Sequence, residues 1–192
     1  MTRQSPPYTT HLDLTSGLAR IRRAVPDAGP WRAWSNFSFA TAQGSMHEVD
    51  VLITAPNGIY MVELKSWRGD IEVKGGTWIQ TTESGEVIEH ADPLQLTAFK
   101  SSALARLLRA VGEDVYLRAL VCLTNDSVRA VVPARDRRYV VSVEELMKRL
   151  ARPTHDARIR MTADRVARVG EALESAGIVS ATGHLGPGAF DS

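Results

Sequence analysis

Two apolar, β-branched segments joined by a tight turn are the feature of this sequence that most restricts its fold. The segments are 47–55 and 59–65, and Pro56, Asn57 and Gly58 separate them. Residues with this composition around a Pro-Asn-Gly turn are typical of a β-hairpin. We therefore expect two neighbouring antiparallel strands here.

Helices and strands alternate along the rest of the chain. Capping residues predict four helices, which begin at Thr10, Asp92, Ser142 and Thr162 and end near Pro26, Gly112, Ala151 and Gly177. The second helix carries an apolar stripe, which consists of Leu96, Phe99, Ala103, Leu107 and Val111. Further strands are predicted at 31–39, 115–123 and 139–141, with a small antiparallel extension at 71–73, 78–82 and 87–88. This alternation predicts an α/β fold.

Composition indicates one folded domain. The chain has 192 residues, of which 44% are hydrophobic and 23% charged, close to the globular average. We expect the domain to occupy 1–182 and a Gly/Pro-rich linker 183–192, leading toward a further domain. Cys122 lies in an apolar run, and the N-terminus lacks the apolar segment of a signal peptide. A cytoplasmic protein is expected.

Four charged residues in the predicted hairpin form the candidate site. Because side chains alternate along a strand, Glu48 and Asp50 should share one face, as should Glu63 and Lys65. A loop centred on Pro56-Asn57 pairs Asp50 with Glu63 and Glu48 with Lys65, whereas a loop centred on Asn57-Gly58 pairs Asp50 with Lys65. In both registers the four residues converge on one face.

Two opposed carboxylates repel unless a cation lies between them. Mg²⁺ or Mn²⁺ suits such a pair, because Mg²⁺ takes one or two carboxylates and keeps several waters. Asp50 and Glu63 are therefore candidate metal ligands, and Glu48 is a further ligand or a partner for Lys65. Lys65 could position a water or stabilise charge on a phosphate. The alternative is a solvated strand face with a weak ion pair, worth about 0–1 kcal/mol.

The sequence also resembles the NERD (nuclease-related) domain of the PD-(D/E)XK nuclease superfamily. The resemblance rests on Glu48-Val49-Asp50, on residues 55–60, on the run from Val62-Glu63-Leu64-Lys65 to Ile71, and on Asp92-Pro93-Leu94-Gln95.

The resemblance implies a mixed central sheet flanked by helices, like that of restriction endonucleases. It implies that Asp50 and Glu63 bind the metal, that Lys65 is catalytic and that Gln95 faces the site. Relatives commonly supply a glutamate from the first helix, where this chain has Asp13 and no glutamate. Either Asp13 or Glu48 replaces it, or metal binding is weakened.

A narrower resemblance is to the N-terminal region of the serine/threonine kinases of the phage growth limitation system, a BREX-type bacterial defence. It implies a covalently attached kinase domain and other defence proteins as possible partners. The chain itself carries no kinase signature. The predicted function is DNA binding with phosphodiester hydrolysis, and the alternative is an inactive nucleic-acid sensor or docking module that regulates a kinase.

Candidate DNA-contacting residues are an aromatic ring and several cations. The formal charge is only +1, from 23 Lys and Arg against 22 Asp and Glu, so any attraction to phosphates must be local. The candidates are Trp67, Arg68, Lys100, Arg135, Arg137 and Arg138. Core packing is the alternative for the tryptophan and a solvated face the alternative for the cations.

Overall fold

The structure is a computed structural model that describes residues 11–178, with side chains described from residue 17 onward. The proposed cap Thr10 and the predicted linker 183–192 lie outside the described residues, and so does the side chain of Asp13.

A mixed five-stranded sheet forms the centre of the molecule, with strand order β1-β2-β3-β7-β9. The first three strands are antiparallel, and β3, β7 and β9 are parallel. Their bounds are β1 Arg32–Ala40, β2 Met46–Ala55, β3 Gly58–Lys65, β7 Leu117–Leu123 and β9 Val140–Ser142. The predicted hairpin and the predicted α/β class are both confirmed.

The register of the hairpin is the first of the two considered. Ala55 pairs with Gly58, so Pro56 and Asn57 form the loop. The Asn57 amide donates to the carbonyl of Arg149, and its oxygen accepts from the Tyr60 hydroxyl, at 2.9 and 3.0 Å. These bonds fix the turn against a neighbouring helix, and with it the register of both strands.

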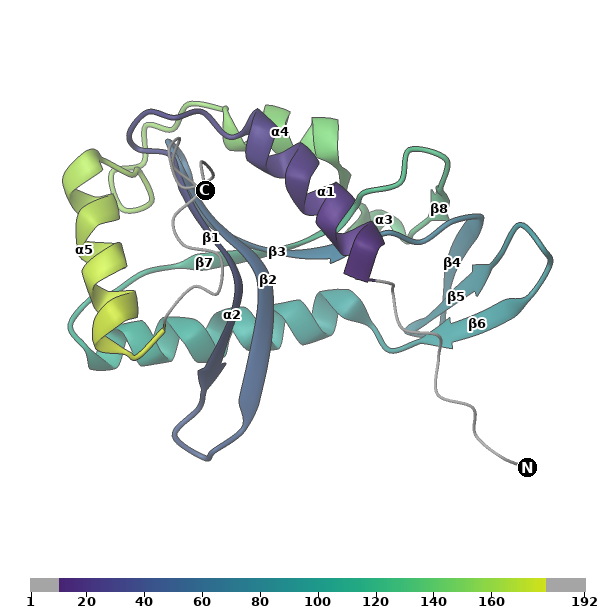
Figure 1. Cartoon of the computed structure of the whole chain (residues 1–192), viewed down its shortest axis with the longest axis horizontal. Coiled ribbons are helices and arrows are strands. Elements are labelled where there is room, and N and C mark those ends of the chain that lie inside the picture. The colour runs from purple at the N-terminus through teal and green to yellow at the C-terminus, as the bar shows by residue number, and fades with distance from the viewer. Residues whose placement is uncertain (1–10, 179–192) are drawn as a thin grey trace.

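Helices cover both faces of this sheet (Figure 1). They are α1 His11–Ala24, α2 Pro93–Ala110, the short α3 Ala134–Arg137, α4 Val143–Leu150 and α5 Ala163–Ser175. Leu52 and Met61 belong to the core beneath α2 and α5, whereas Val51 and Val62 belong to the core beneath α1 and α4. Burial on both faces explains why β7 is apolar except at Arg118.

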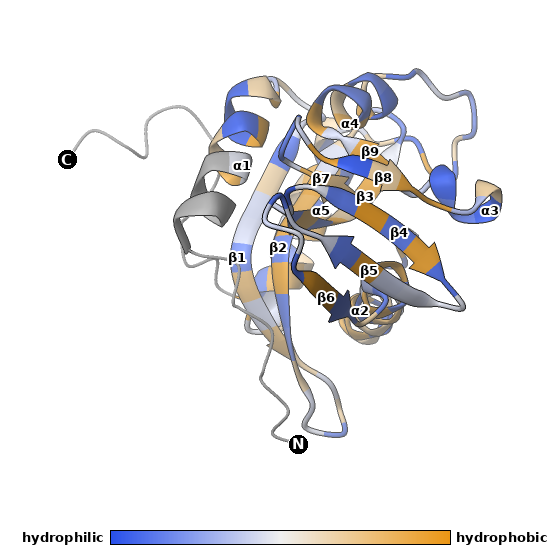
Figure 2. Cartoon of the chain, turned by 90° about the vertical axis from the view of Figure 1, so that its right-hand side faces the viewer, coloured by the Kyte–Doolittle hydropathy of each residue, from blue (hydrophilic) through white to orange (hydrophobic). Residues whose placement is uncertain are grey.

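A second sheet of four short strands, in the order β6-β5-β4-β8, lies beside the end of β3 (Figure 2). Its strands are β4 Asp70–Lys74, β5 Thr77–Thr81, β6 Val87–His90 and β8 Arg129–Val131. Ile71 and Trp78 are buried in a third core cluster together with Val121 and Leu123 of β7. The predicted extension is confirmed, and β8 and α3 are additions that the sequence pattern did not predict.

The buried face of α2 differs from the predicted stripe. Leu96 and Phe99 are 50% and 55% exposed, while Thr97, Leu104 and Leu108 are buried. The stripe was right at Ala103 and Leu107, which pack in the core, and wrong at its other residues. The helix packs mainly on β7, and this contact, rather than the distribution of large residues, determines which side is covered.

Candidate active site

Asp50 lies where the pairing of β2 with β3 ends. The last pair of that ladder is Val51 with Val62. Beyond it, the Asp50 carboxylate accepts a hydrogen bond from the backbone N–H of Leu64, at 2.7 Å. The side chain thus replaces the missing strand partner, and this bond holds the carboxylate between the two strands.

The β1–β2 ladder is also irregular at this point. Asn36, opposite Asp50, has a φ of 51°, and regular pairs flank it on both sides. Val49 and Leu52, three residues apart, both pack in the core beneath α2. The strict alternation of side chains along β2 is therefore lost at Asp50.

This irregularity corrects the predicted position of Glu48. His47 contacts the ring of Phe99 in α2, with ring centroids 5.5 Å apart. Glu48, between His47 and Val49, therefore lies on the other face of the strand and is exposed. Its predicted partner Lys65 bonds Glu63 instead. The structure does not bring Glu48 to the cluster.

Two lysines hold the carboxylate of Glu63. Lys65 Nζ lies 2.9 Å from Oε1, and Lys100 Nζ of α2 lies 2.9 Å from Oε2. All three side chains are largely buried, with exposed fractions of 15% for Glu63, 23% for Lys65 and 19% for Lys100. We call Asp50, Glu63, Lys65 and Lys100 the charge cluster. It contains two carboxylates and two amines.

Lys100 was predicted to contact DNA, with a solvated face as the alternative, and its largely buried position in the charge cluster shows that the solvated face was wrong. The local sequence contains no signal for it, because the contact depends on where α2 crosses β3. The two amines supply the compensation for opposed carboxylates that the sequence analysis assigned to a metal ion.

The two carboxylates differ in acidity. Burial and the nearby charge of Glu63 raise the pKa of Asp50 from 3.8 to about 6, although the Leu64 N–H and both lysines act in the opposite direction. Burial also acts to raise the pKa of Glu63, but Lys65 and Lys100 outweigh it and the pKa is lowered. At neutral pH Glu63 is ionised, while Asp50 changes protonation within about one unit of neutrality.

The charge cluster fits a divalent cation under one condition. Asp50 and Glu63 are two hard oxygen ligands, which suits an ion that keeps several waters. Both oxygens of Glu63 bond lysines, so at least one lysine must move away for the ion to bind Glu63. Within the described part of the chain, no three His, Cys, Asp or Glu side chains form a metal site by themselves.

Gln95 lies away from the charge cluster. It is exposed in the first turn of α2, and its backbone N–H bonds the Asp92 carboxylate at 3.2 Å. Lys100 is five residues further along the helix, which places the two side chains roughly 140° apart around the helix axis. Gln95 instead lines a cavity on the other side of α2.

Trp67 is a core residue rather than an exposed platform for bases. It is 8% exposed and stacks on His90, with ring centroids 4.3 Å apart. His90 in turn bonds Gln80 at 2.9 Å, and burial followed by the charge of Lys65 lowers the His90 pKa. The predicted contact of Trp67 with splayed bases therefore does not fit its position. The buried Trp67 ring and the partly buried His90 ring support Lys65, whose Nζ lies 5.8 Å from the Trp67 ring centroid.

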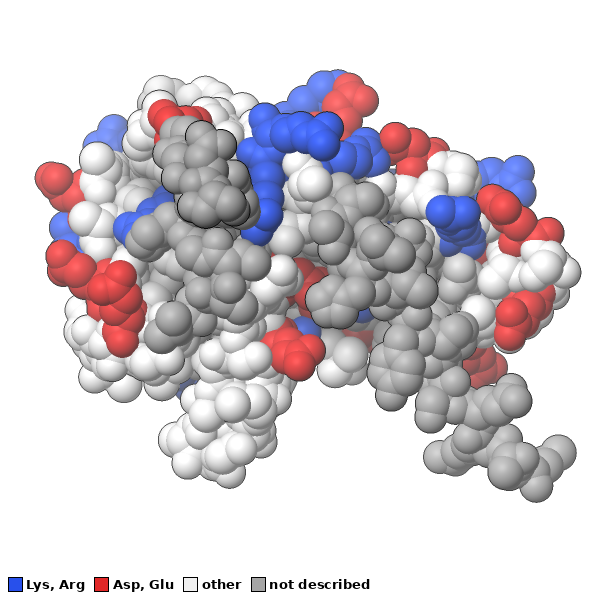
Figure 3. Space-filling model, viewed as in Figure 1, with Lys and Arg blue, Asp and Glu red and all other residues white. Residues whose placement is uncertain are grey.

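The predicted basic residues occupy two separate places. Arg68 is exposed beside a hollow at the ends of β3 and β7. Arg135 and Arg137 belong to α3, next to β9, and Arg138 follows them with its guanidinium over the Tyr139 ring. Figure 3 shows Lys and Arg gathered over α1 and α4 on one face, with acidic groups scattered around them. DNA binding by these residues remains a prediction.

Two comparisons with known proteins agree with the resemblance. Residues 16–124 match the family model described as the nuclease-related domain, NERD. A protein of Streptomyces coelicolor named "Probable kinase PglW" is 43% identical over 163 residues, which are 84% of this chain and 10% of that protein. The chain thus spans about a tenth of the length of the curated relative that it matches.

One further property concerns the length and hydropathy of the helices. Among residues 11–178 the structure has no helix that is long and apolar enough to span a membrane.

The family model covers more than half of the chain, and its segment contains all four residues of the charge cluster. The chain belongs to the nuclease-related domain (NERD) family.

Proposed function

We propose that this chain is a DNA-binding, metal-dependent nuclease domain that hydrolyses phosphodiester bonds, within a larger cytoplasmic protein that also carries a kinase. The charge cluster is the observation that carries the proposal. Asp50, Glu63 and Lys65 come from two neighbouring strands, and each side chain is held by a specific hydrogen bond or ion pair. Two converging carboxylates and a lysine can support metal-assisted phosphodiester hydrolysis, because the carboxylates can hold the ion and the lysine can stabilise charge on the phosphate.

Each residue of the charge cluster would have a separate role in the proposed hydrolysis. Asp50 and Glu63 would hold Mg²⁺ or Mn²⁺, and the bound ion would orient a water and offset charge on the phosphate. Lys65 and Lys100, released from Glu63, would donate to phosphate oxygens. Asp50, with its pKa near 6, would lose its proton as the pH rises toward neutrality. The stacked rings of Trp67 and His90 would keep Lys65 in position.

Plasmid cleavage tests the proposal. Purified protein is incubated with supercoiled plasmid and Mg²⁺ or Mn²⁺, together with Asp50→Asn, Glu63→Gln and Lys65→Met. Lys74→Met is the matched control, because Lys74 is exposed and pairs with Glu72 away from the charge cluster. We expect nicking by the wild type and by the control, and a loss of at least about 100-fold in each cluster variant. Cleavage that persists in all three cluster variants would falsify the assignment.

A second candidate is a nucleic-acid sensor that does not cut and that regulates the attached kinase. It is favoured by the pairing of both Glu63 oxygens with lysines, which balances the charge cluster without a metal. Calorimetric titration of Mn²⁺ into the wild type and Glu63→Gln separates the candidates. The nuclease requires metal binding that Glu63→Gln weakens. DNA affinity without metal binding or cleavage would favour the sensor.

The likeness to a protein named as a kinase supports the attached kinase. The role in phage defence is proposed from the resemblance to the kinases of the phage growth limitation system. The longer protein that contains this domain provides the test. We expect it to transfer phosphate from ATP, and we expect DNA to alter that rate if the domain acts as a sensor. If DNA leaves the rate of phosphate transfer unchanged, although the isolated domain binds DNA, the regulatory role is excluded.

A further inference from the structure

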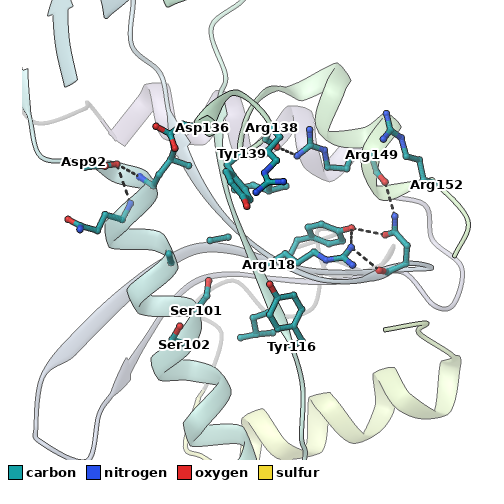
Figure 4. Close-up of a pocket in the computed structure, with 18 residues that line it drawn as sticks. Asp92, Ser101, Ser102, Tyr116, Arg118, Asp136, Arg138, Tyr139, Arg149 and Arg152 are labelled. Atoms are coloured by element: carbon teal, nitrogen blue, oxygen red, sulfur yellow. Dashed lines mark hydrogen bonds between the residues drawn. The ribbon is translucent and has the colours of Figure 1, made fainter. Parts of the chain in front are cut away.

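A cavity of about 810 Å³ lies beside α2, and Lys100 is not among the residues that line it (Figure 4). Residues of α2, the first half of β7, α3 and α4 line it. Asp50, Glu63 and Lys65 are not among the lining residues. The cavity is therefore separate from the proposed nuclease site.

One wall of this cavity is an unpaired strand edge. β9 pairs with β7 only from Val121 to Leu123, where the Val121 N–H donates to the Tyr139 carbonyl. Since alternate residues of a strand direct their backbone groups to the same edge, Leu117 and Ala119 present theirs to the cavity. Over the described residues, no hydrogen bond on this edge is recorded for either of them. Two N–H and two C=O groups are available to a ligand.

Four arginines line the same cavity: Arg118, Arg138, Arg149 and Arg152. In residues 17–178 none of them forms an ion pair with a carboxylate. The two acids in the lining are engaged, since Asp92 caps α2 and Asp136 pairs with Arg135. The cavity therefore carries an excess of positive charge.

The arginines are partly held in place by neutral groups. Arg118 donates to the Tyr60 hydroxyl at 2.7 Å, and Arg149 donates to the Arg138 carbonyl. Ser101, only 3% exposed, also lines the cavity, and its hydroxyl has no partner among the described residues. Charged and polar donors from α2, from β7 and from the region of α3 and α4 thus line the same cavity.

We propose that this cavity binds an extended acidic peptide, which adds as a short strand to the open edge of β7. The backbone of the peptide would pair with Leu117 and Ala119, and its carboxylates would accept from the arginines. Strand addition uses main-chain hydrogen bonds for affinity and side-chain contacts for selectivity. Arginine forms paired hydrogen bonds with carboxylates. A nucleic acid would use the arginines and leave the strand edge unpaired.

Fluorescence anisotropy tests the proposal with EDTA present and without DNA, so that it is independent of nuclease activity. The probe is a fluorescein-labelled decapeptide of alternating Glu and Val. We expect a saturable complex, a dissociation constant raised about tenfold by Arg138→Gln with Arg152→Gln, and no effect of Arg23→Gln. Arg23 is the control, because it is exposed on α1, outside the cavity.

A second pair of measurements tests strand addition itself. Ala119→Pro removes the N–H on the open edge, and N-methylation of alternate peptide residues removes the matching groups on the ligand without altering the protein. We expect each change to weaken binding about tenfold or more. An N-methylated peptide that binds as tightly as the parent overturns the proposal. Equal binding of a decapeptide of alternating Lys and Val also overturns the proposal. Two further results would do so: anisotropy in which only labelled oligothymidylate binds at these arginines, and sedimentation in which the open edge pairs two copies of this chain.

Discussion

Asp50 differs from an ordinary surface aspartate because it fills the gap where two strands separate. Its carboxylate satisfies the N–H of Leu64, which β2 no longer reaches. The same position buries the carboxylate beside Glu63, and both effects raise its pKa to about 6. The native state therefore holds the proton on Asp50 more tightly than the unfolded chain does.

That difference predicts a pH-dependent gain in stability for Asp50→Asn. Because the folded pKa exceeds the unfolded one, the contribution of Asp50 to stability is full below about pH 4 and is lost as the pH rises through about 6. Asparagine keeps an acceptor for Leu64 and carries no charge. We expect the variant to be more stable than wild type by roughly 1 to 3 kcal/mol at pH 8 and equal to it at pH 4, by urea denaturation. Equal stability at both pH values would contradict the buried, ionised carboxylate.

Lys100 competes with a metal ion for Glu63. The Lys100 Nζ donates a hydrogen bond to Oε2 of Glu63 at 2.9 Å. A charge-assisted hydrogen bond of this kind is worth about 1.5–3 kcal/mol. We expect Lys100→Met to tighten Mn²⁺ binding about tenfold, measured by calorimetry. Lys74→Met should leave the affinity unchanged. Weaker Mn²⁺ binding in Lys100→Met would show that the lysine organises the carboxylates rather than excluding the ion.

At the scale of elements, the segment between β3 and β4 connects the charge cluster to the smaller sheet. Gln80 of β5 donates to the Arg68 carbonyl at 2.8 Å, and the Arg129 N–H donates to the Gly69 carbonyl at 3.0 Å. These bonds hold the chain that leaves Lys65. The geometry of the segment requires glycine at position 69, where φ is 81° and a Cβ would clash with the carbonyl oxygen of Thr81.

We expect Gly69→Ala to destabilise the protein by at least about 2 kcal/mol, because strain from positive φ adds to the clash. Gly76→Ala is the matched control. Its φ of 86° is similar, and nothing lies within 4 Å of the added Cβ, so only the conformational cost of about 1 kcal/mol remains. Urea denaturation measures both. Equal costs for the two variants would mean that the β3–β4 segment adapts freely.

At the scale of the whole molecule, signals within short segments predicted structure well and contacts between segments escaped prediction. The capping residue Ser142 and the turn at Asn57 acted locally, and the structure has both as expected. Glu48 was misplaced because the irregularity at Asn36, on another strand, shifts the alternation along β2. Lys100 was missed because its partner lies across a helix–sheet contact. The candidate site was thus predicted in its two strands but not in the helix that completes it.

DNA affinity is also a property of the whole molecule, because a net charge of +1 gives no general attraction to phosphates. Arg68 is exposed three residues after Lys65, beside the ends of the parallel strands β3 and β7, where open α/β sheets commonly bind ligands. We expect Arg68→Gln to weaken binding of unrelated duplexes equally and to reduce the slope of log Kd against log salt by about one. Arg109→Gln should change neither, since Arg109 pairs with Asp114 at the far end of α2. Anisotropy titrations at several salt concentrations measure both, and an unchanged slope for Arg68→Gln would place the DNA backbone elsewhere on the surface.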